Sequence, residues 1–194
     1  MKFGALKILN SRLGGIGILF SGSAKGVNER KTMIARSLSE AFLHRATATQ
    51  LLLACSPDVA CVNLMCEHVG GGCACRVSLS LERMALLEEV DLRGNRLPQL
   101  PESLFTLPRL RVVRASGNAL QALPRSLGAR CSALEALDIG DNALRDLPLA
   151  ALAALPSLRR LRVAGNPLTE QALEGIYGNP ALRRAVEEGA AGHW

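Results

Sequence analysis

Aromatic residues are scarce in this chain of 194 residues, where they make up 3% of the sequence. A hydrophobic core therefore has to be built mainly from leucine, valine and alanine. The scarcity also bears on nucleic acids, because binding of single strands through base stacking needs aromatic side chains among basic ones. A nucleic-acid contact by this chain would be driven by phosphate charge and would weaken strongly as salt is added.

Long hydrophobic runs and catalytic motifs are absent as well. No stretch approaches the roughly 20 apolar residues that a helix needs to cross a bilayer. The sequence contains neither a GxSxG nucleophile motif nor a phosphate-binding loop with Gly and Lys. We therefore expect no transmembrane segment, no catalytic residues, no cofactor and no small-molecule substrate.

Lysine is missing after residue 31, and acidic residues are missing before Glu29. Residues 1–86 hold 10 Lys/Arg against 5 Asp/Glu, whereas residues 87–194 hold 13 against 12. A basic segment that also carries Ser and Gly is typical of mitochondrial or plastid targeting. The alternatives are a basic extension that wraps around a partner and a secretory signal with residues 13–20 as its apolar run. We expect an intracellular protein, in a mitochondrion or another organelle if the segment is a targeting signal.

Four asparagines recur in the second half of the chain at intervals of 23, 24 and 24 residues, each inside the same apolar frame, LxxLxLxxNxL. Repetition at this period is the sequence sign of a solenoid. The four copies of the frame are Leu87, Val90, Leu92, Asn95 and Leu97; Leu110, Val113, Ala115, Asn118 and Leu120; Leu134, Leu137, Ile139, Asn142 and Leu144; and Leu158, Leu161, Val163, Asn166 and Leu168.

The alternating frame positions predict short strands with one buried face, and neighbouring copies must stack because no single copy can bury that face alone. Each asparagine lies where the chain leaves a strand, and its amide can both donate to and accept from adjacent backbone groups. The sequence therefore predicts a parallel sheet on the concave side and a structural ladder formed by Asn95, Asn118, Asn142 and Asn166. In the segment that returns to the next strand, Cys131 replaces a core leucine, which predicts a buried, unreactive thiol.

The frame resembles the leucine-rich repeat family, in its LxxLxLxxNxLxxLP form, because Pro101, Pro124 and Pro148 each follow a leucine at matching positions. The resemblance covers residues 87–168. It implies an α/β solenoid, a short right-handed superhelix with a concave parallel sheet. We expect four clear repeats, a degenerate leading repeat and helical caps at both ends.

Residues between the frame positions face out of the sheet, where a protein partner could dock. Two columns alternate in sign from one repeat to the next, so adjacent strands could pair opposite charges and neutralise the surface. The columns are Asp91, Arg114, Asp138 and Arg162, and Glu88, Arg111, Glu135 and Arg159. Alternatively, a partner of complementary charge docks there. The predicted partner-binding residues are Glu89, Asp91, Arg93, Val112, Arg114, Ser116, Asp138, Asp141, Arg160 and Arg162.

A third column, which begins at Arg93, continues with Ser116, Gly140 and Ala164 and so becomes small after its first member. These small residues predict a shallow trough on the concave face that could admit a helix or an extended segment of a partner.

Five of the six cysteines fall between Cys55 and Cys75. Cys66, His68, Cys73 and Cys75 could in principle supply four ligands to a tetrahedral zinc ion, although their spacing fits no common zinc module. A disulfide-linked cap is a second interpretation. The third, which we favour, is a degenerate repeat, because counting one period back from Leu87 places Leu64, Glu67, Val69, Gly72, Ala74 and Val77 on the frame.

Helices are expected on both sides of the repeats. One would start at Asn28 with Ile34, Leu38 and Leu52 on one side and end near Cys55. After the repeats, a helix ended by Gly178 and a second one with Asn179 as its cap are expected. The predicted organisation is a basic N-terminal segment (1–31), a helical N-terminal cap (32–63), leucine-rich repeats (64–168, of which 64–86 are degenerate) and a helical C-terminal cap and tail (169–194).

The three histidines, His44, His68 and His193, lie outside residues 87–168, so the repeats hold no catalytic set. Binding is the usual function of a solenoid surface. The sequence therefore predicts a non-catalytic protein–protein interaction module, most simply an adaptor or accessory structural subunit of a larger multiprotein assembly. A reversible regulatory adaptor for a signalling protein is the alternative, and a zinc-binding or nucleic-acid-contacting protein is a more remote one.

Overall fold

The computed structural model describes residues 32–60, 66, 73–81, 83–124, 127 and 131–192. The chain divides into two units, Met1–Arg30 and Lys31–Trp194, and all described residues belong to the second. The expected N-terminal segment 1–31, including Asn28 and Glu29, lies outside the described residues, as do His68 and His193. In the described part, no helix is both long enough and apolar enough to span a bilayer.

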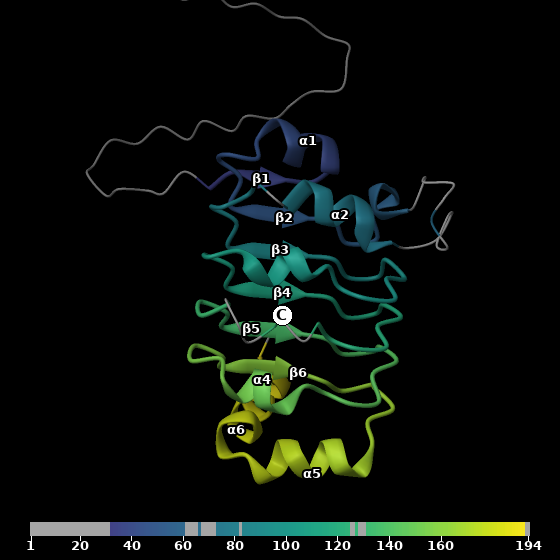
Figure 1. Cartoon of the computed structure of the whole chain (residues 1–194), viewed down its shortest axis with the longest axis vertical. Helices are drawn as coiled ribbons and strands as arrows, with labels where there is room; N and C mark the ends of the chain where they lie inside the picture. The colour runs from purple at the N-terminus through teal and green to yellow at the C-terminus, as the bar shows by residue number, and fades with distance from the viewer. Residues whose placement is uncertain are drawn as a thin grey trace, which may run out of the picture. The chain divides into compact units, whose positions relative to one another are not determined.

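The strands of the second unit form one parallel sheet in which each strand pairs with its sequence neighbours (Figure 1). Paired residues are 23 or 24 positions apart from the third strand onward, as the asparagine spacing predicts. The parallel sheet expected of an α/β solenoid is therefore confirmed. The strands are β1 (Ile34–Ala35), β2 (Gln50–Leu52), β3 (Glu89–Asp91), β4 (Val112–Arg114), β5 (Ala136–Asp138) and β6 (Arg160–Arg162).

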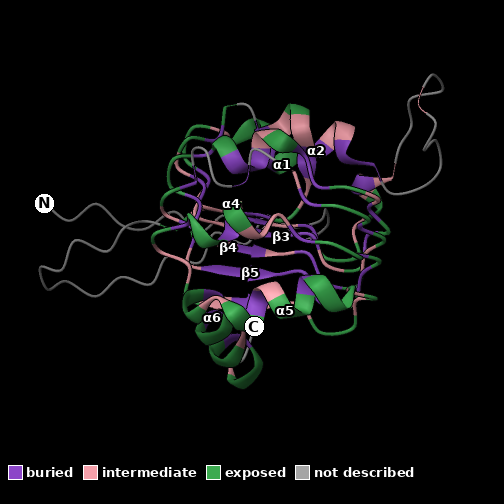
Figure 2. Cartoon of the chain, turned by 60° about the horizontal axis from the view of Figure 1, so that its bottom comes forward, coloured by how far each residue is buried: buried purple, intermediate pink, exposed green. Residues whose placement is uncertain are grey.

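The core lies between the sheet and the segments that return to the next strand, as the buried colour in Figure 2 shows. The middle residue of each frame strand is completely buried, since successive strand residues point to opposite faces. Return segments include the short helices η2 (Glu102–Thr106) and α4 (Leu149–Ala153), which bury Leu104 and Leu152. Cys131 is 2% exposed, and this burial raises its pKa to about 11, so the prediction of a buried thiol is confirmed.

The expected leading repeat at 64–86 is wrong in its first half. The strand that pairs with β3 is β2, 39 positions earlier in the sequence, and not a strand near Val69. Ala74 and Val77 belong to helix α2 (Ala74–Leu81), whereas Leu64, Glu67, Val69 and Gly72 lie outside the described residues. Its second half does fit, because Leu81 and Met84 are fully buried, like Leu104 in the next coil.

The long helix expected to run from Asn28 to about Cys55 is also wrong, because Ile34 and Leu52 lie in β1 and β2. Only α1 (Leu38–Leu43) is helical there. It begins at Ser37, whose hydroxyl accepts the backbone N–H of Glu40 at 3.0 Å, while the Glu40 carboxylate accepts the N–H of Arg36 at 2.7 Å. These reciprocal bonds resemble a capping box, which fixes the start of a helix.

The coil that contains β2 is longer than the others because residues are inserted between η1 (Pro57–Val59) and α2. The backbone N–H of Cys73 donates to the carbonyl of Val59 at 3.2 Å, so the insertion begins and ends at the same place. Strand pairing on both sides of this coil keeps the same parallel pattern. The added residues therefore leave the stack of strands intact.

Two helices follow β6, as predicted: α5 (Glu170–Gly178) and α6 (Pro180–Ala191). The side chain of Asn179 accepts the backbone N–H groups of Ala181 and Leu182, which confirms it as the cap of α6. A Cβ atom added to Gly189 would lie 2.5 Å from the carbonyl oxygen of Leu161. Helix α6 therefore lies against the backbone of the last strand, below it in Figure 1.

Candidate functional site

The second side of the sheet carries the polar residues that alternate with the buried ones. We call this side the polar sheet face. It consists of outward-pointing strand residues and of residues two positions after a strand: Gln50, Glu89, Asp91, Arg93, Val112, Arg114, Ser116, Ala136, Asp138, Gly140, Arg160 and Arg162. Because the strands are in regular register, these side chains occupy fixed positions relative to one another.

The asparagine ladder fixes the turns at the ends of these strands. The amide nitrogen of Asn118 donates to the carbonyl of Ala115 in its own coil and to that of Leu92 in the preceding coil, at 3.0 and 2.9 Å. Its oxygen accepts the N–H groups of Asn95 and Leu97 at 3.0 and 2.9 Å. One side chain therefore satisfies four backbone groups and joins two coils.

The other three asparagines also join adjacent coils, each with its oxygen accepting one backbone N–H group. The Asn142 amide donates to Ala115 and its oxygen accepts from Leu120, while Asn166 donates to Ile139 and accepts from Leu144. Asn95 donates to Leu53 and accepts from Ser56, so the ladder extends to the coil of β2.

The first three members of the outer charge column, Glu88, Arg111 and Glu135, pair as their alternating signs predict. Arg111 donates from Nε and one terminal nitrogen to the two carboxylate oxygens of Glu135, at 3.0 and 3.1 Å, and lies 4.0 Å from Glu88. The hydrogen bond from Arg111 lowers the pKa of Glu135, and the same bond raises the pKa of Arg111. These three charges therefore offset one another between adjacent coils.

The inner column pairs as predicted between Asp138 and Arg162, which lie 3.8 Å apart, but differently at its first two members. Arg114 forms its ion pair with Glu89 on β3 rather than with Asp91. Asp91 instead accepts from the guanidinium of Arg93, two residues later, with a shortest distance of 2.6 Å. Both carboxylates are on the same strand, β3.

Asp138 is the most deeply buried acidic residue described, at 1% exposure. It accepts the hydroxyl of Ser116 at 2.8 Å and the backbone N–H of Gly140 at 3.1 Å, with Arg162 at 3.8 Å. The Arg162 side chain also lies over Gly140, because a Cβ added there would be 3.0 Å from the arginine Nε. The shallow trough expected along Ser116 and Gly140 is thus filled by Arg162 at this point.

The predicted partner-binding residues differ widely in accessibility. The side chains of Arg93, Asp141 and Arg162 are 43%, 58% and 36% exposed and can be reached from solvent. Buried members of the set are Asp91, Ser116 and Asp138, and half-buried members are Glu89, Val112, Arg114 and Arg160.

Sequence reasoning missed Gln50 on this face, because β2 was taken as part of a helix. Its amide donates to the carboxylate of Glu89 at 3.0 Å and extends the polar face by one strand. The short run at Leu51 and Leu53, followed by Ser56 at the asparagine position, is the signal that could have identified it.

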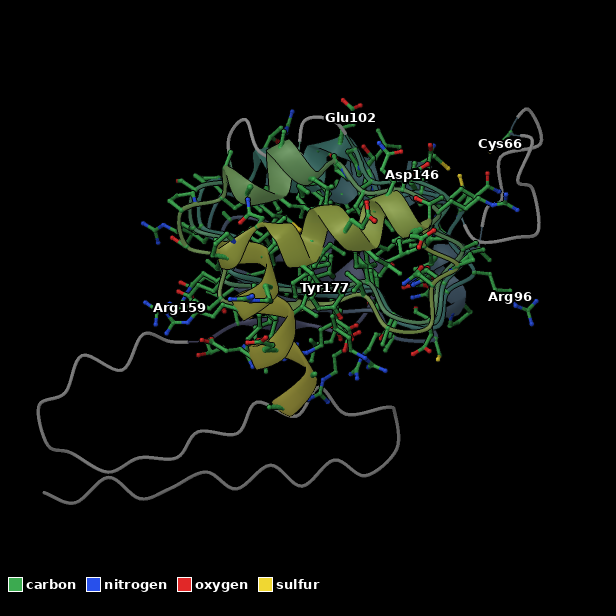
Figure 3. All side chains as sticks on the ribbon, turned by 90° about the horizontal axis from the view of Figure 1, so that it is seen from below. Cys66, Arg96, Glu102, Asp146, Arg159 and Tyr177 are labelled. Carbon is green, nitrogen blue, oxygen red and sulfur yellow. The ribbon has the colours of Figure 1, made fainter. Side chains whose placement is uncertain are left out.

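Three of the four metal-ligand candidates come together. The sulfur of Cys73 lies 3.6 Å from that of Cys66 and 3.0 Å from that of Cys75, and all three sulfurs lie within 4.8 Å of one another. Figure 3 shows Cys66 on the side of the stack where Arg96 lies, away from Arg159. The fourth candidate, His68, is outside the described residues.

A family model described as leucine rich repeat matches residues 108–168. Among solved structures, a leucine-rich repeat protein from Leptospira interrogans is similar to this chain, with 29% identity and a TM-score of 0.48 over 57% of the chain. This chain spans 26% of the length of that protein. A comparison with curated proteins found no match. The repeated frame, the parallel strands and the asparagine ladder agree with this match, and the chain contains leucine-rich repeats over residues 108–168.

Proposed function

We propose that the chain is a non-catalytic interaction module that serves as an adaptor or accessory subunit of a multiprotein assembly, and that the polar sheet face binds its partner. Leucine-rich repeats typically mediate protein–protein interaction, which supports the general part of this proposal. The observation that carries the specific part is the set of charged side chains from successive coils, held in register on one face.

Two exposed members of this face and the neighbouring Asp141 form a defined pattern of charge. Arg93 and Arg162 present guanidinium groups, and Asp141 presents a carboxylate 3.0 Å from Arg162. Their buried neighbours, Asp91 and Asp138, restrict how far the arginines can move. A partner surface with acidic groups opposite the arginines would meet side chains that are already ordered, so little conformational entropy is lost on binding.

Charge removal on the polar sheet face tests the proposal. The variant Arg93→Gln/Arg162→Gln removes two charges from the face, and Arg145→Gln/Arg183→Gln removes two exposed arginine charges away from it. We expect the first variant to weaken partner binding about tenfold and the second to leave it unchanged. Thermal melting of both variants shows whether the fold is retained.

Gentle fractionation of native extracts distinguishes an accessory subunit from a reversible adaptor. An accessory subunit is expected to migrate with a large complex in the wild type and in the control, and to shift to smaller fractions when the face is altered. Retention of the face variant in the complex would exclude this face as the binding site. Migration of the wild type as a small species would instead favour a reversible adaptor.

An organellar location rests on the composition of residues 1–31, which are basic and contain one acid, Glu29. We expect the full chain to enter a mitochondrion or another organelle and a chain lacking residues 1–31 to stay outside it. Imaging of both forms with a C-terminal label compares them directly. Equal distribution of the two forms would count against a targeting role.

A further inference from the structure

We propose that Cys66, Cys73 and Cys75 form a binding site for a single Zn²⁺ ion that ties the insertion of the β2 coil to the start of α2. The site is separate from the polar sheet face. It uses three thiolate ligands and leaves a fourth coordination position for water or a further ligand.

The distances between the sulfurs carry the proposal. Tetrahedral zinc with Zn–S bonds of about 2.3 Å requires sulfur atoms about 3.8 Å apart. Cys66 and Cys73 have their sulfurs 3.6 Å apart, those of Cys73 and Cys75 are 3.0 Å apart, and the third pair lies within 4.8 Å. Movements of about 1 Å or less would bring all three sulfurs to the edge lengths of a zinc tetrahedron. A disulfide would use only two of them.

The backbone around the cluster favours negatively charged sulfur. Cys73 directly precedes helix α2 and Cys75 lies in its first turn, where the helix dipole stabilises anions. The backbone N–H of Cys75 also donates to the sulfur of Cys73 at 3.4 Å. Three thiolates with Zn²⁺ carry a net charge of −1, which suits this position.

The insertion gives the ion a structural role. Its two ends meet where the N–H of Cys73 donates to Val59, and Cys66 lies between these ends in the sequence. Coordination would close a second, smaller loop between Cys66 and Cys73, and closing a loop lowers the entropy of the unfolded chain. Zn²⁺ displaces one proton from each thiol, so binding releases protons and involves no oxidation or reduction.

Cobalt substitution tests the site on the full chain. The protein is purified with reductant in metal-free buffer, and Co²⁺ is added without oxygen. We expect one equivalent to bind, with a thiolate-to-cobalt charge-transfer band and the visible bands of tetrahedral cobalt, and Zn²⁺ to displace it. Cys66→Ser, Cys73→Ser and Cys75→Ser are each expected to lose the charge-transfer band, whereas Cys55→Ser and Cys131→Ser are expected to retain it.

The Co²⁺ titration of the wild type tests the zinc site even if a serine variant fails to fold. Circular dichroism would reveal such a failure. Absence of the charge-transfer band in the reduced wild type would overturn the proposal. Persistence of the band in a folded Cys73→Ser variant would overturn it too. A disulfide among these cysteines that forms without reductant, together with no metal uptake after reduction, would identify the cluster as a redox pair instead.

Discussion

At the scale of single residues, the asparagine ladder concentrates several backbone hydrogen bonds in one side chain. Asn118 donates to Leu92 and Ala115 and accepts from Asn95 and Leu97. Its replacement by alanine leaves these groups unsatisfied in a partly buried site. We expect Asn118→Ala to lower the free energy of unfolding by about 1–3 kcal/mol, as measured by urea denaturation. Gln121→Ala, an exposed control close by, should change it by less than about 0.5 kcal/mol, and equal effects of the two would refute the ladder's role.

The reactivity of each cysteine also depends on how far that residue is buried. Burial raises the pKa of Cys131 to about 11, so its thiolate is rare at neutral pH, whereas Cys55 is exposed. We expect iodoacetamide to alkylate Cys55 readily in the folded protein and Cys131 only after unfolding, as followed by mass spectrometry of peptides. Equal alkylation of both in the folded state would mean that the coil of Cys131 opens easily.

The sequence predicts some residue roles well and others poorly. Ladder asparagines were predictable because each one acts on backbone groups at a fixed distance along the frame. Ion-pair partners were not, because Arg114 and Arg93 choose between carboxylates on the same strand, and spacing alone does not say which one a long side chain reaches. Spacing alone also did not predict that the long side chain of Arg162 lies over Gly140 and fills the trough there.

At the scale of elements, α6 packs closely enough against β6 to require glycine. A Cβ at Gly189 would lie 2.5 Å from a backbone oxygen of Leu161, which cannot move without displacing the strand. We expect Gly189→Ala to destabilise the protein by about 1–3 kcal/mol and to increase hydrogen exchange in α6 and β6. Gly178→Ala is the matched control, because nothing lies within 4 Å of its Cβ position, and it should be neutral or slightly stabilising. Similar melting of both variants would show that α6 adapts to a larger side chain.

The elements missed by sequence reasoning are those whose structure depends on distant pairing. Two residues of β2 belong to the leucine run 51–53, which reads equally well as part of a helix. Only the pairing of β2 with β3, 39 positions later, makes this segment a strand. Ser56 in place of asparagine and the unequal spacing hid this coil. The C-terminal helices were predictable because Asn179 and the following proline are strong local signals.

At the scale of the whole molecule, charge pairs between coils make stability depend on pH. Arg111 holds the pKa of Glu135 below its ordinary value, so the pair stabilises the folded state above that value and the contribution is lost as pH falls through the lowered pKa. Because both side chains are exposed by a third or more, we expect less than about 1 kcal/mol. The difference in melting temperature between the wild type and Glu135→Gln should therefore shrink on acidification below about pH 4.

Glu174→Gln provides the comparison for this effect, because Glu174 is an exposed residue on α5. The same melting measurements on this variant show the effect of removing a carboxylate outside the two charge columns. A Glu135→Gln difference that does not change with pH would show that the pair contributes nothing measurable to stability.

The backbone hydrogen bond between Cys73 and Val59 affects how the sequence of such a chain can evolve. Because these two positions are joined, the distance from one strand to the next does not depend on how many residues are inserted between them. An insertion here can therefore bring new chemistry, such as a cluster of thiols, while the stacked coils keep their period. A search at a constant period will overlook any coil that carries such an insertion.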